Sequence, residues 1–160
     1  MSKGEPRRVV ILGIGNLLLG DEGVGVHVAR RLAGVELPEG VEVIEGGTKP
    51  VESLGSVGDI AKLIIVDAVA GQGHPGAVYR LPASVVPDSE AQLSLHEFTL
   101  AEALVDWNLQ GLDETRIVII GVGTQEVDWG TNLSPEVEAS LPAVLETVIA
   151  EAAAERTKRE

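Results

Sequence analysis

The acidic and histidine side chains that could do chemistry lie at three separate points of the sequence. Two adjacent carboxylates, Asp21 and Glu22, lie in a glycine-rich segment, G-I-G-N-L-L-L-G-D-E-G-V-G (Gly13–Gly25). Asp67 closes an otherwise apolar run, L-I-I-V-D-A-V, and His96 opens a segment of helical period. Carboxylates and an imidazole offer oxygen and nitrogen donors, which suit a borderline divalent ion such as nickel or zinc. The residues by themselves therefore indicate a metal site and go no further.

Each of these residues also has a purely structural interpretation. The two acids of the first segment could cap the helix that follows them, because carboxylates are stabilised at a helix N-terminus. Asp67 could cap a loop, although a buried carboxylate needs a partner or a metal. A lone histidine is more often a surface or capping residue than a ligand. Among the three histidines, His27 is expected on an exposed helix and His74 in a glycine- and proline-rich loop, which leaves His96 better placed.

Several catalytic and binding motifs are incomplete or absent. A dinucleotide fingerprint, G-x-G-x-x-G, would require glycine in place of Leu18, and the acids that follow would repel a phosphate. His96-Glu97 begins like the zinc motif H-E-x-x-H, but Leu100 replaces the second histidine. Ser56 does not lie in a G-x-S-x-G elbow. The sequence contains no cysteine, which excludes disulfides, thiolate catalysis and thiolate metal sites.

The elements that position these residues follow from the hydrophobic pattern. Buried strands are expected at Val9–Ile14 and Ile117–Val122, further strands at Val41–Ile44 and Leu63–Val66, and a weaker, more exposed strand at Ala77–Leu81. Helices are expected from about Gly23 (apolar face Val24, Val28, Leu32 and Val35), over Val51–Val57, from His96 to Trp107, and from Pro135 after the N-cap Ser134. Pro142 is expected to kink the last helix or to mark a restart.

This order of elements predicts an α/β fold, a three-layer structure with an open, twisted, mostly parallel five-stranded sheet and helices on both faces. The carboxyl ends of parallel strands meet at one edge of such a sheet, and ligands bind there. We therefore expect the polar segments Asn16–Glu22 and Glu45–Thr48 to converge with Asp67.

Length and charge narrow the class of protein. The 160 residues suit a single domain, with a core over about residues 9–153 and short polar tails. Hydrophobic residues make up 44% of the chain and aromatic residues 2%, so aliphatic side chains must fill the core. A net charge of -13 argues against a nucleic-acid partner. No apolar run approaches the roughly 18 residues of a membrane span, and we expect an unprocessed cytoplasmic protein without membrane insertion.

Five motifs occur along the chain in a distinctive order, from about Val9 to Leu145. They are G-I-G-N-L-L-L-G-D-E-G-V-G, E-G-G-T, I-I-V-D-A, the helix-opening histidine and V-I-I-G-V-G. Together they resemble the [NiFe] hydrogenase maturation proteases, the C-terminal endopeptidases of the hydrogenase large subunit. The first block is specific to that family, G-G-T and V-D-A are supporting, and the histidine is weak alone.

This resemblance implies an endopeptidase that removes the C-terminal extension of the large-subunit precursor after nickel insertion. The Ni²⁺ would be supplied by the substrate and would serve as a recognition ligand. The family's metal ligands, which are also its catalytic-site residues, correspond here to Glu22, Asp67 and His96, with the general base unassigned. The implied substrate-binding residues are Glu45, Gly46, Gly47 and Thr48. This sequence departs from the family at Lys49-Pro50, which would alter which hydrogenase isoform is accepted.

Three other functions are also compatible with the residues alone. The first is a non-catalytic nickel-binding maturation chaperone on the same fold. The second is a small nucleotide- or phosphate-binding domain that uses the glycines around Asn16. The third is a purely structural partner of the hydrogenase.

Overall fold

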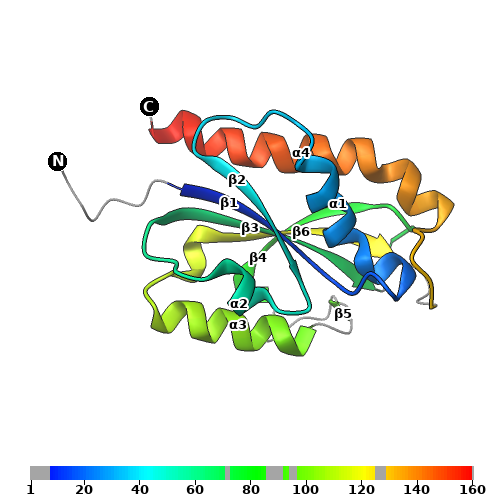
Figure 1. Cartoon of the computed structure of the whole chain (residues 1–160), viewed down its shortest axis with the longest axis horizontal. Helices are drawn as coiled ribbons and strands as arrows, with labels where there is room; N and C mark the ends of the chain where they lie inside the picture. The colour runs from blue at the N-terminus through cyan, green and yellow to red at the C-terminus, as the bar shows by residue number, and fades with distance from the viewer. Residues whose placement is uncertain (1–7, 71–72, 86–91, 94–96, 125–128, 160) are drawn as a thin grey trace.

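The computed structural model consists of a twisted sheet between two layers of helices (Figure 1). It describes residues 8–70, 73–85, 92–93, 97–124 and 129–159. Within these ranges the strands are β1 (Arg8–Ile14), β2 (Val41–Gly47), β3 (Ile60–Ala70), β4 (Val78–Pro82), β5 (Gln92–Leu93) and β6 (Ile117–Thr124). The helices are α1 (Val24–Leu32), α2 (Pro50–Leu54), α3 (Glu97–Leu109) and α4 (Pro135–Arg159), with 3₁₀ turns η1 (Gly20–Gly23), η2 (Ala83–Val85) and η3 (Glu114–Arg116).

The five longer strands form the sheet in the order β2-β1-β3-β6-β4. The first four are parallel, and β4 runs antiparallel to β6 at the edge. This confirms the prediction of a mostly parallel five-stranded sheet. The two-residue β5 is an addition that pairs antiparallel with Val69 and Ala70 of β3. The pattern gave no sign of β5, because two residues show no periodicity.

Each face of the sheet has its own hydrophobic core, because successive side chains of a strand point to opposite faces. In β1, Val9 and Ile11 pack with α1 and α4, whereas Val10 and Leu12 pack with α2 and α3. Figure 1 shows α1 and α4 on one side of the sheet and α2 and α3 on the other. Helices on both faces were predicted, and the central strands are accordingly mostly apolar on both faces, with Lys62 and Asp67 of β3 among the exceptions.

Three details of the predicted elements are wrong. First, α1 ends at Leu32, so Val35 is not on its apolar face and is 44% exposed after Gly34. Second, β3 continues past Asp67 to Ala70 because it stays paired with β6 up to Thr124. Third, of the two alternatives for Pro142, the restart is wrong, because α4 is one helix from Pro135 to Arg159 with Pro142 inside it.

The continuity of α4 has a packing explanation. Its buried side chains keep helical spacing on both sides of the proline, at Val137, Leu141, Val144, Val148 and Ala152. Their contact with the sheet stabilises a single helix and offsets the cost of proline in a helix interior. No helix in the described ranges combines the length and the apolar composition that crossing a membrane requires.

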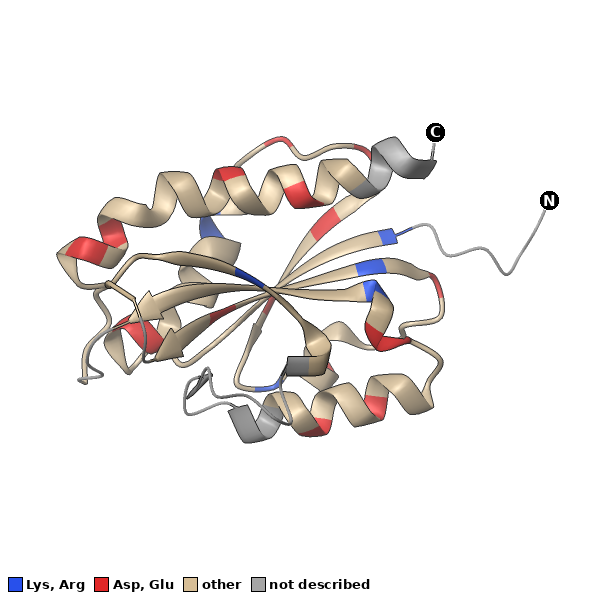
Figure 2. Cartoon of the chain, turned by 180° about the vertical axis from the view of Figure 1, so that it is seen from behind, with Lys and Arg blue, Asp and Glu red and all other residues tan. Residues whose placement is uncertain are grey.

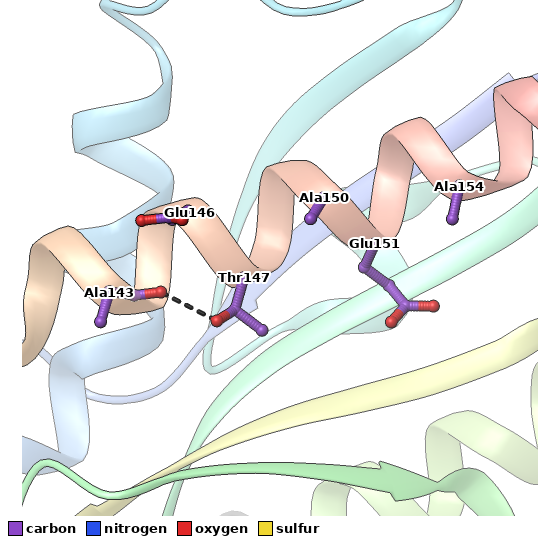
Figure 3. A pocket seen from close by; sticks show the side chains of 6 residues that line it. All are labelled: Ala143, Glu146, Thr147, Ala150, Glu151 and Ala154. Atoms are coloured by element: carbon purple, nitrogen blue, oxygen red, sulfur yellow. Dashed lines mark hydrogen bonds between the residues drawn. The ribbon is translucent and has the colours of Figure 1, made fainter.

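An ion-pair cluster joins α4 to the sheet. The Glu151 carboxylate accepts hydrogen bonds from Lys62 of β3 and from Arg80 of β4, whose Nε lies 2.7 Å away. The pKa of Glu151 is lowered to about 2, chiefly by the hydrogen bond from Arg80. A pocket along the outer side of α4 is lined by small and acidic residues, including Glu151 (Figure 3). This pocket contains none of the site residues predicted from the sequence.

Candidate active site at the carboxyl edge of the sheet

The polar segments converge at one edge of the sheet, as the sequence predicted. Gly13 of β1 is in register with Glu45 of β2 on one side and with Val66 of β3 on the other. Just beyond β1, the Gly15 amide donates to the Gly47 carbonyl at 2.9 Å. The carboxyl ends of β2 and β1 are therefore at the same level, next to Val66 of β3, which continues beyond them.

Glu22 lies in the loop that follows β1, and that loop is closed by its own hydrogen bonds. The Asn16 amide donates to the Glu22 carbonyl at 3.3 Å, and the Glu22 amide donates to the Leu19 carbonyl at 3.1 Å. The Asn16 side chain also accepts from the Leu18 amide at 2.9 Å. Glu22 is 1% exposed. The loop thus holds this carboxylate buried at the edge of the sheet.

Asp67 lies in β3, immediately after the residue that is level with Gly13. It is fully buried, and its Oδ1 accepts from the Ala68 amide at 2.8 Å. The expectation that Asp67 closes its strand is wrong, because Asp67 pairs in register with Gly121 of β6 and the ladder continues. Asp67 is nevertheless on the strand next to Glu22, because η1, which contains Glu22, contacts β3 directly.

The glycines of the first segment allow close contact between backbones. A Cβ on Gly25 would lie 2.2 Å from the carbonyl oxygens of both Ile14 and Val66, so α1 begins in direct contact with β1 and β3. A Cβ on Gly15, whose φ is +141°, would lie 2.2 Å from the Glu22 carbonyl. These contacts account for the glycine pattern by packing within the chain. The glycine pattern therefore no longer supports a phosphate-binding loop.

Asp21 has a structural role that the sequence did not show. Its carboxylate accepts from the Ser134 amide at 2.7 Å and from the Ser134 hydroxyl at 2.8 Å. The Ser134 hydroxyl in turn accepts from the Val137 amide at 3.4 Å, as an N-cap residue does. Asp21 therefore stabilises the start of α4. The interpretation of the two acids as caps of α1 is wrong, because the N-cap of α1 is Gly23, without a side-chain cap bond.

The segment Glu45–Thr48 is bonded to the start of the loop that carries Glu22, and its Glu45 and Thr48 are exposed. Arg30 of α1 donates to the Glu45 carboxylate through Nε at 2.8 Å and Nη2 at 3.3 Å. This hydrogen bond raises the pKa of Arg30. Thr48 borders a groove between the start of α2 and α3. Sequence reasoning missed the pairing of Arg30 with Glu45, because the two residues are on different elements.

The histidines differ in what the structure describes of them. His96, the third predicted ligand, lies outside the described residues, directly before α3. His74 is exposed, as expected, and its Nδ1 is 3.1 Å from the Pro75 carbonyl oxygen. His27 was expected to be exposed but is half-buried on α1. Burial lowers the pKa of His27, and the charge of Glu138 partly opposes that shift.

The donor set of the described site is two buried carboxylates. Within the described residues, no three acidic or imidazole side chains gather closely enough to hold a metal ion. Glu22 and Asp67 provide two oxygen donors of the type that divalent cations accept, and either carboxylate could take a proton from water.

Figure 2 shows that acidic residues far outnumber basic ones on the ribbon, including along α3 and α4.

Comparisons with known proteins agree with this architecture. The family model described as "Hydrogenase maturation protease" matches residues 26–151. The chain is 34% identical over 146 residues to the hydrogenase 2 maturation protease of Escherichia coli, and the match covers 89% of each protein.

Solved structures show the same similarity. The E. coli hydrogenase maturating endopeptidase HybD superposes with a TM-score of 0.77 at 31% identity, covering 90% of this chain and 91% of that one. The [NiFe] hydrogenase maturation protease HybD from Thermococcus kodakarensis superposes with a TM-score of 0.76 at 28% identity, covering 91% and 99%.

Proposed function

Because this chain belongs to the hydrogenase maturation protease family, we propose that it removes the C-terminal extension of a [NiFe] hydrogenase large-subunit precursor after nickel insertion. The chain is a peptidase, as the family description and the similar proteins indicate. In this proposal the nickel arrives with the substrate. It acts as the ligand by which the peptidase distinguishes a loaded precursor from an empty one.

The observation that carries the proposal is the burial of Glu22 and Asp67 at one edge of the sheet. The Glu22 carboxylate comes from the loop after β1 and that of Asp67 from the neighbouring strand β3, and the two residues are 1% and 0% exposed. Two carboxylates shielded from water attract a divalent cation strongly and supply the oxygen ligands that such an ion accepts. A nickel ion held in the precursor would gain oxygen ligands from both residues, with His96 as the proposed third ligand.

This arrangement gives nickel a proofreading role. A precursor without nickel presents no cation to the buried acids, so it lacks the interaction that would seat its C-terminal segment. The strength of the interaction depends on low solvent exposure, because Coulomb attraction is much stronger away from bulk water. We leave the general base unassigned, since Glu22 and Asp67 are chemically equivalent candidates.

The neighbouring segment supports a role in holding the precursor. The segment Glu45–Thr48 ends β2 at the same edge of the sheet, next to β1. Thr48 lines a groove together with Lys49 and Pro50. We propose that this segment contacts the polypeptide near the bond that is cut. Lys49-Pro50 would then contribute to the choice of hydrogenase. We also propose that the reaction takes place in the cytoplasm, which is consistent with the cysteine-free sequence.

The test uses a cognate large-subunit precursor in nickel-loaded and nickel-free forms, incubated with the purified chain and analysed by intact mass. We expect a short C-terminal fragment to be lost from the nickel-loaded precursor alone. Cleavage of both forms would support the peptidase activity but show that nickel is not the ligand by which the precursor is recognised. Cleavage of neither form would reject the proposed substrate reaction.

A further inference from the structure

Two large apolar side chains are exposed next to each other beside the site. Leu18 is 57% exposed and Trp129 is 81% exposed. The Gly20 amide donates to the Gly130 carbonyl, and the Gly130 amide donates to the Leu18 carbonyl, both at 2.8 Å. This parallel bridge joins the loop after β1 to the segment before α4 and places Leu18 and Trp129 in register. In Figure 1 the blue loop and the orange segment meet beyond the ends of the parallel strands.

The pair is fixed to the same loop that carries Glu22. The Asn16 amide donates to the Glu22 carbonyl at 3.3 Å, so the exposed Leu18 and the buried Glu22 belong to one closed loop. The bonds from Ser134 to Asp21 connect the two segments a second time, at 2.7 and 2.8 Å. The backbone segments that carry Leu18 and Trp129 are therefore fixed to each other before any partner arrives, which lowers the entropy cost of binding.

We propose that Leu18 and Trp129, together called the apolar platform, bind an apolar surface of the large-subunit precursor beside the segment that is cut. This inference rests on the proposed function and names a second contact of the same site. A peptidase must hold its polypeptide against the loop that carries its site residues; Leu18 is on that loop, and Trp129 is on the segment bonded to it.

The contrast between the two tryptophans supports this assignment. The chain has two, and Trp107 is fully buried in the core under α3, whereas Trp129 is 81% exposed. Tryptophan is the residue type most enriched among the residues that dominate protein interfaces. The surrounding surface belongs to a chain of net charge -13, so apolar contact rather than ion pairing is what the platform offers a partner.

The platform touches polypeptide and not the reacting bond, so its loss should weaken binding and leave the chemical step unchanged. The experiment measures initial rates against concentration of the nickel-loaded precursor for the wild type, Leu18→Ser and Trp129→Ala. The matched control is Leu109→Ala, which removes a side chain that is also 81% exposed but lies on α3. Thermal unfolding of each variant verifies that the fold is retained.

We expect KM to rise by about tenfold or more in Leu18→Ser and in Trp129→Ala, with kcat within about twofold of the wild type. Leu109→Ala should match the wild type in both constants. Unchanged KM in both platform variants would overturn the proposal. So would a wild-type dimer, seen by sedimentation, that Trp129→Ala dissociates, because the platform would then bind a second copy of this chain.

Failure of the proposed function can be distinguished from failure of the platform. If the wild type leaves the nickel-loaded precursor uncut, the cleavage reaction is rejected, and the same uncut precursor serves as a binding probe. The platform is then supported if Trp129→Ala weakens that complex about tenfold or more relative to Leu109→Ala, and rejected if the two variants bind equally.

Discussion

Asp21 and Glu22 are adjacent acids with different surroundings. Both oxygens of the Asp21 carboxylate accept hydrogen bonds from Ser134, which caps α4. Glu22 is more deeply buried, in the loop that follows β1 and contacts β3. A structural role therefore falls to the first acid and the proposed substrate role to the second. Residue type could not separate these roles.

The first prediction separates the two acids by experiment. Asp21→Ala should lower the free energy of unfolding by about 1–3 kcal/mol, because the Ser134 amide loses its acceptor. Glu22→Gln and Asp67→Asn should stay within about 1 kcal/mol of the wild type, since each keeps its shape and removes a buried charge. Urea unfolding measures these differences.

Cleavage should show the opposite pattern. We expect Glu22→Gln and Asp67→Asn to leave the nickel-loaded precursor uncut, and His96→Ala to do the same. Asp21→Ala should retain cleavage at a temperature where it is folded. Normal processing by any two of the three site variants would contradict a shared site.

At the scale of elements, the site depends on how closely α1 approaches the sheet. Gly25 brings the helix backbone against the carbonyls of Ile14 and Val66, at the point where β1 and β3 present the site loops. Any side chain here would push α1 away from both strands. The same movement would displace η1, which carries Glu22.

Gly25→Ala should therefore destabilise the protein by roughly 3 kcal/mol or more, because a Cβ would lie 2.2 Å from two backbone oxygens that cannot rotate away. Gly34→Ala is the matched control. Its Cβ would have Arg31 O, at 3.8 Å, as its nearest neighbour, so stability should be unchanged or raised by about 0.4–1 kcal/mol. Equal stability of the two variants in thermal unfolding would refute the close-contact explanation.

At the scale of the whole molecule, Glu151 links three elements at the edge opposite to β2. Lys62 of β3 and Arg80 of β4 both donate to this carboxylate of α4. The side chain of Glu151 is 12% exposed, so the pairs are partly shielded from water. The cluster attaches the edge strand β4 to the longest helix.

This cluster makes stability depend on pH in a defined direction. The pKa of Glu151 is about 2 in the folded protein, below the ordinary value of 4.5. The unfolded chain therefore binds the proton more readily, and the contribution is complete above pH 4.5 and lost as the pH falls towards 2.

Glu151→Gln should cost about 1–2 kcal/mol at pH 7, after allowance for the solvent exposure of Arg80, and the difference from the wild type should shrink between pH 4.5 and pH 2. Urea unfolding at pH 7 and at pH 3 measures it. Glu146→Gln, on the exposed side of the same helix, should differ from the wild type by less than about 0.5 kcal/mol at either pH. A pH-independent cost of Glu151→Gln would show that the effect is packing and not charge.

The sequence by itself determined the fold class and the edge where the site lies. Strand period and apolar runs are local properties, so Val9–Ile14 and Ile117–Val122 could be placed without knowing their neighbours. Parallel strands must then share a carboxyl edge, which brought Glu22, Glu45 and Asp67 together in advance. The motif order around these residues also indicated the family, which the comparisons confirmed.

Only the tertiary structure decided how the individual side chains are used. The bonds from Ser134 to Asp21 join positions 113 residues apart, and the bridge between Leu19 and Gly130 joins two loops. The pairing of Arg30 with Glu45 and the cluster around Glu151 likewise cross between elements. Such contacts depend on how the helices and strands pack against each other. A local pattern of residue types does not show which distant residues will meet. Hydrophobic period thus specifies the elements, whereas long-range packing assigns a structural role to Asp21 and exposes the platform beside Glu22.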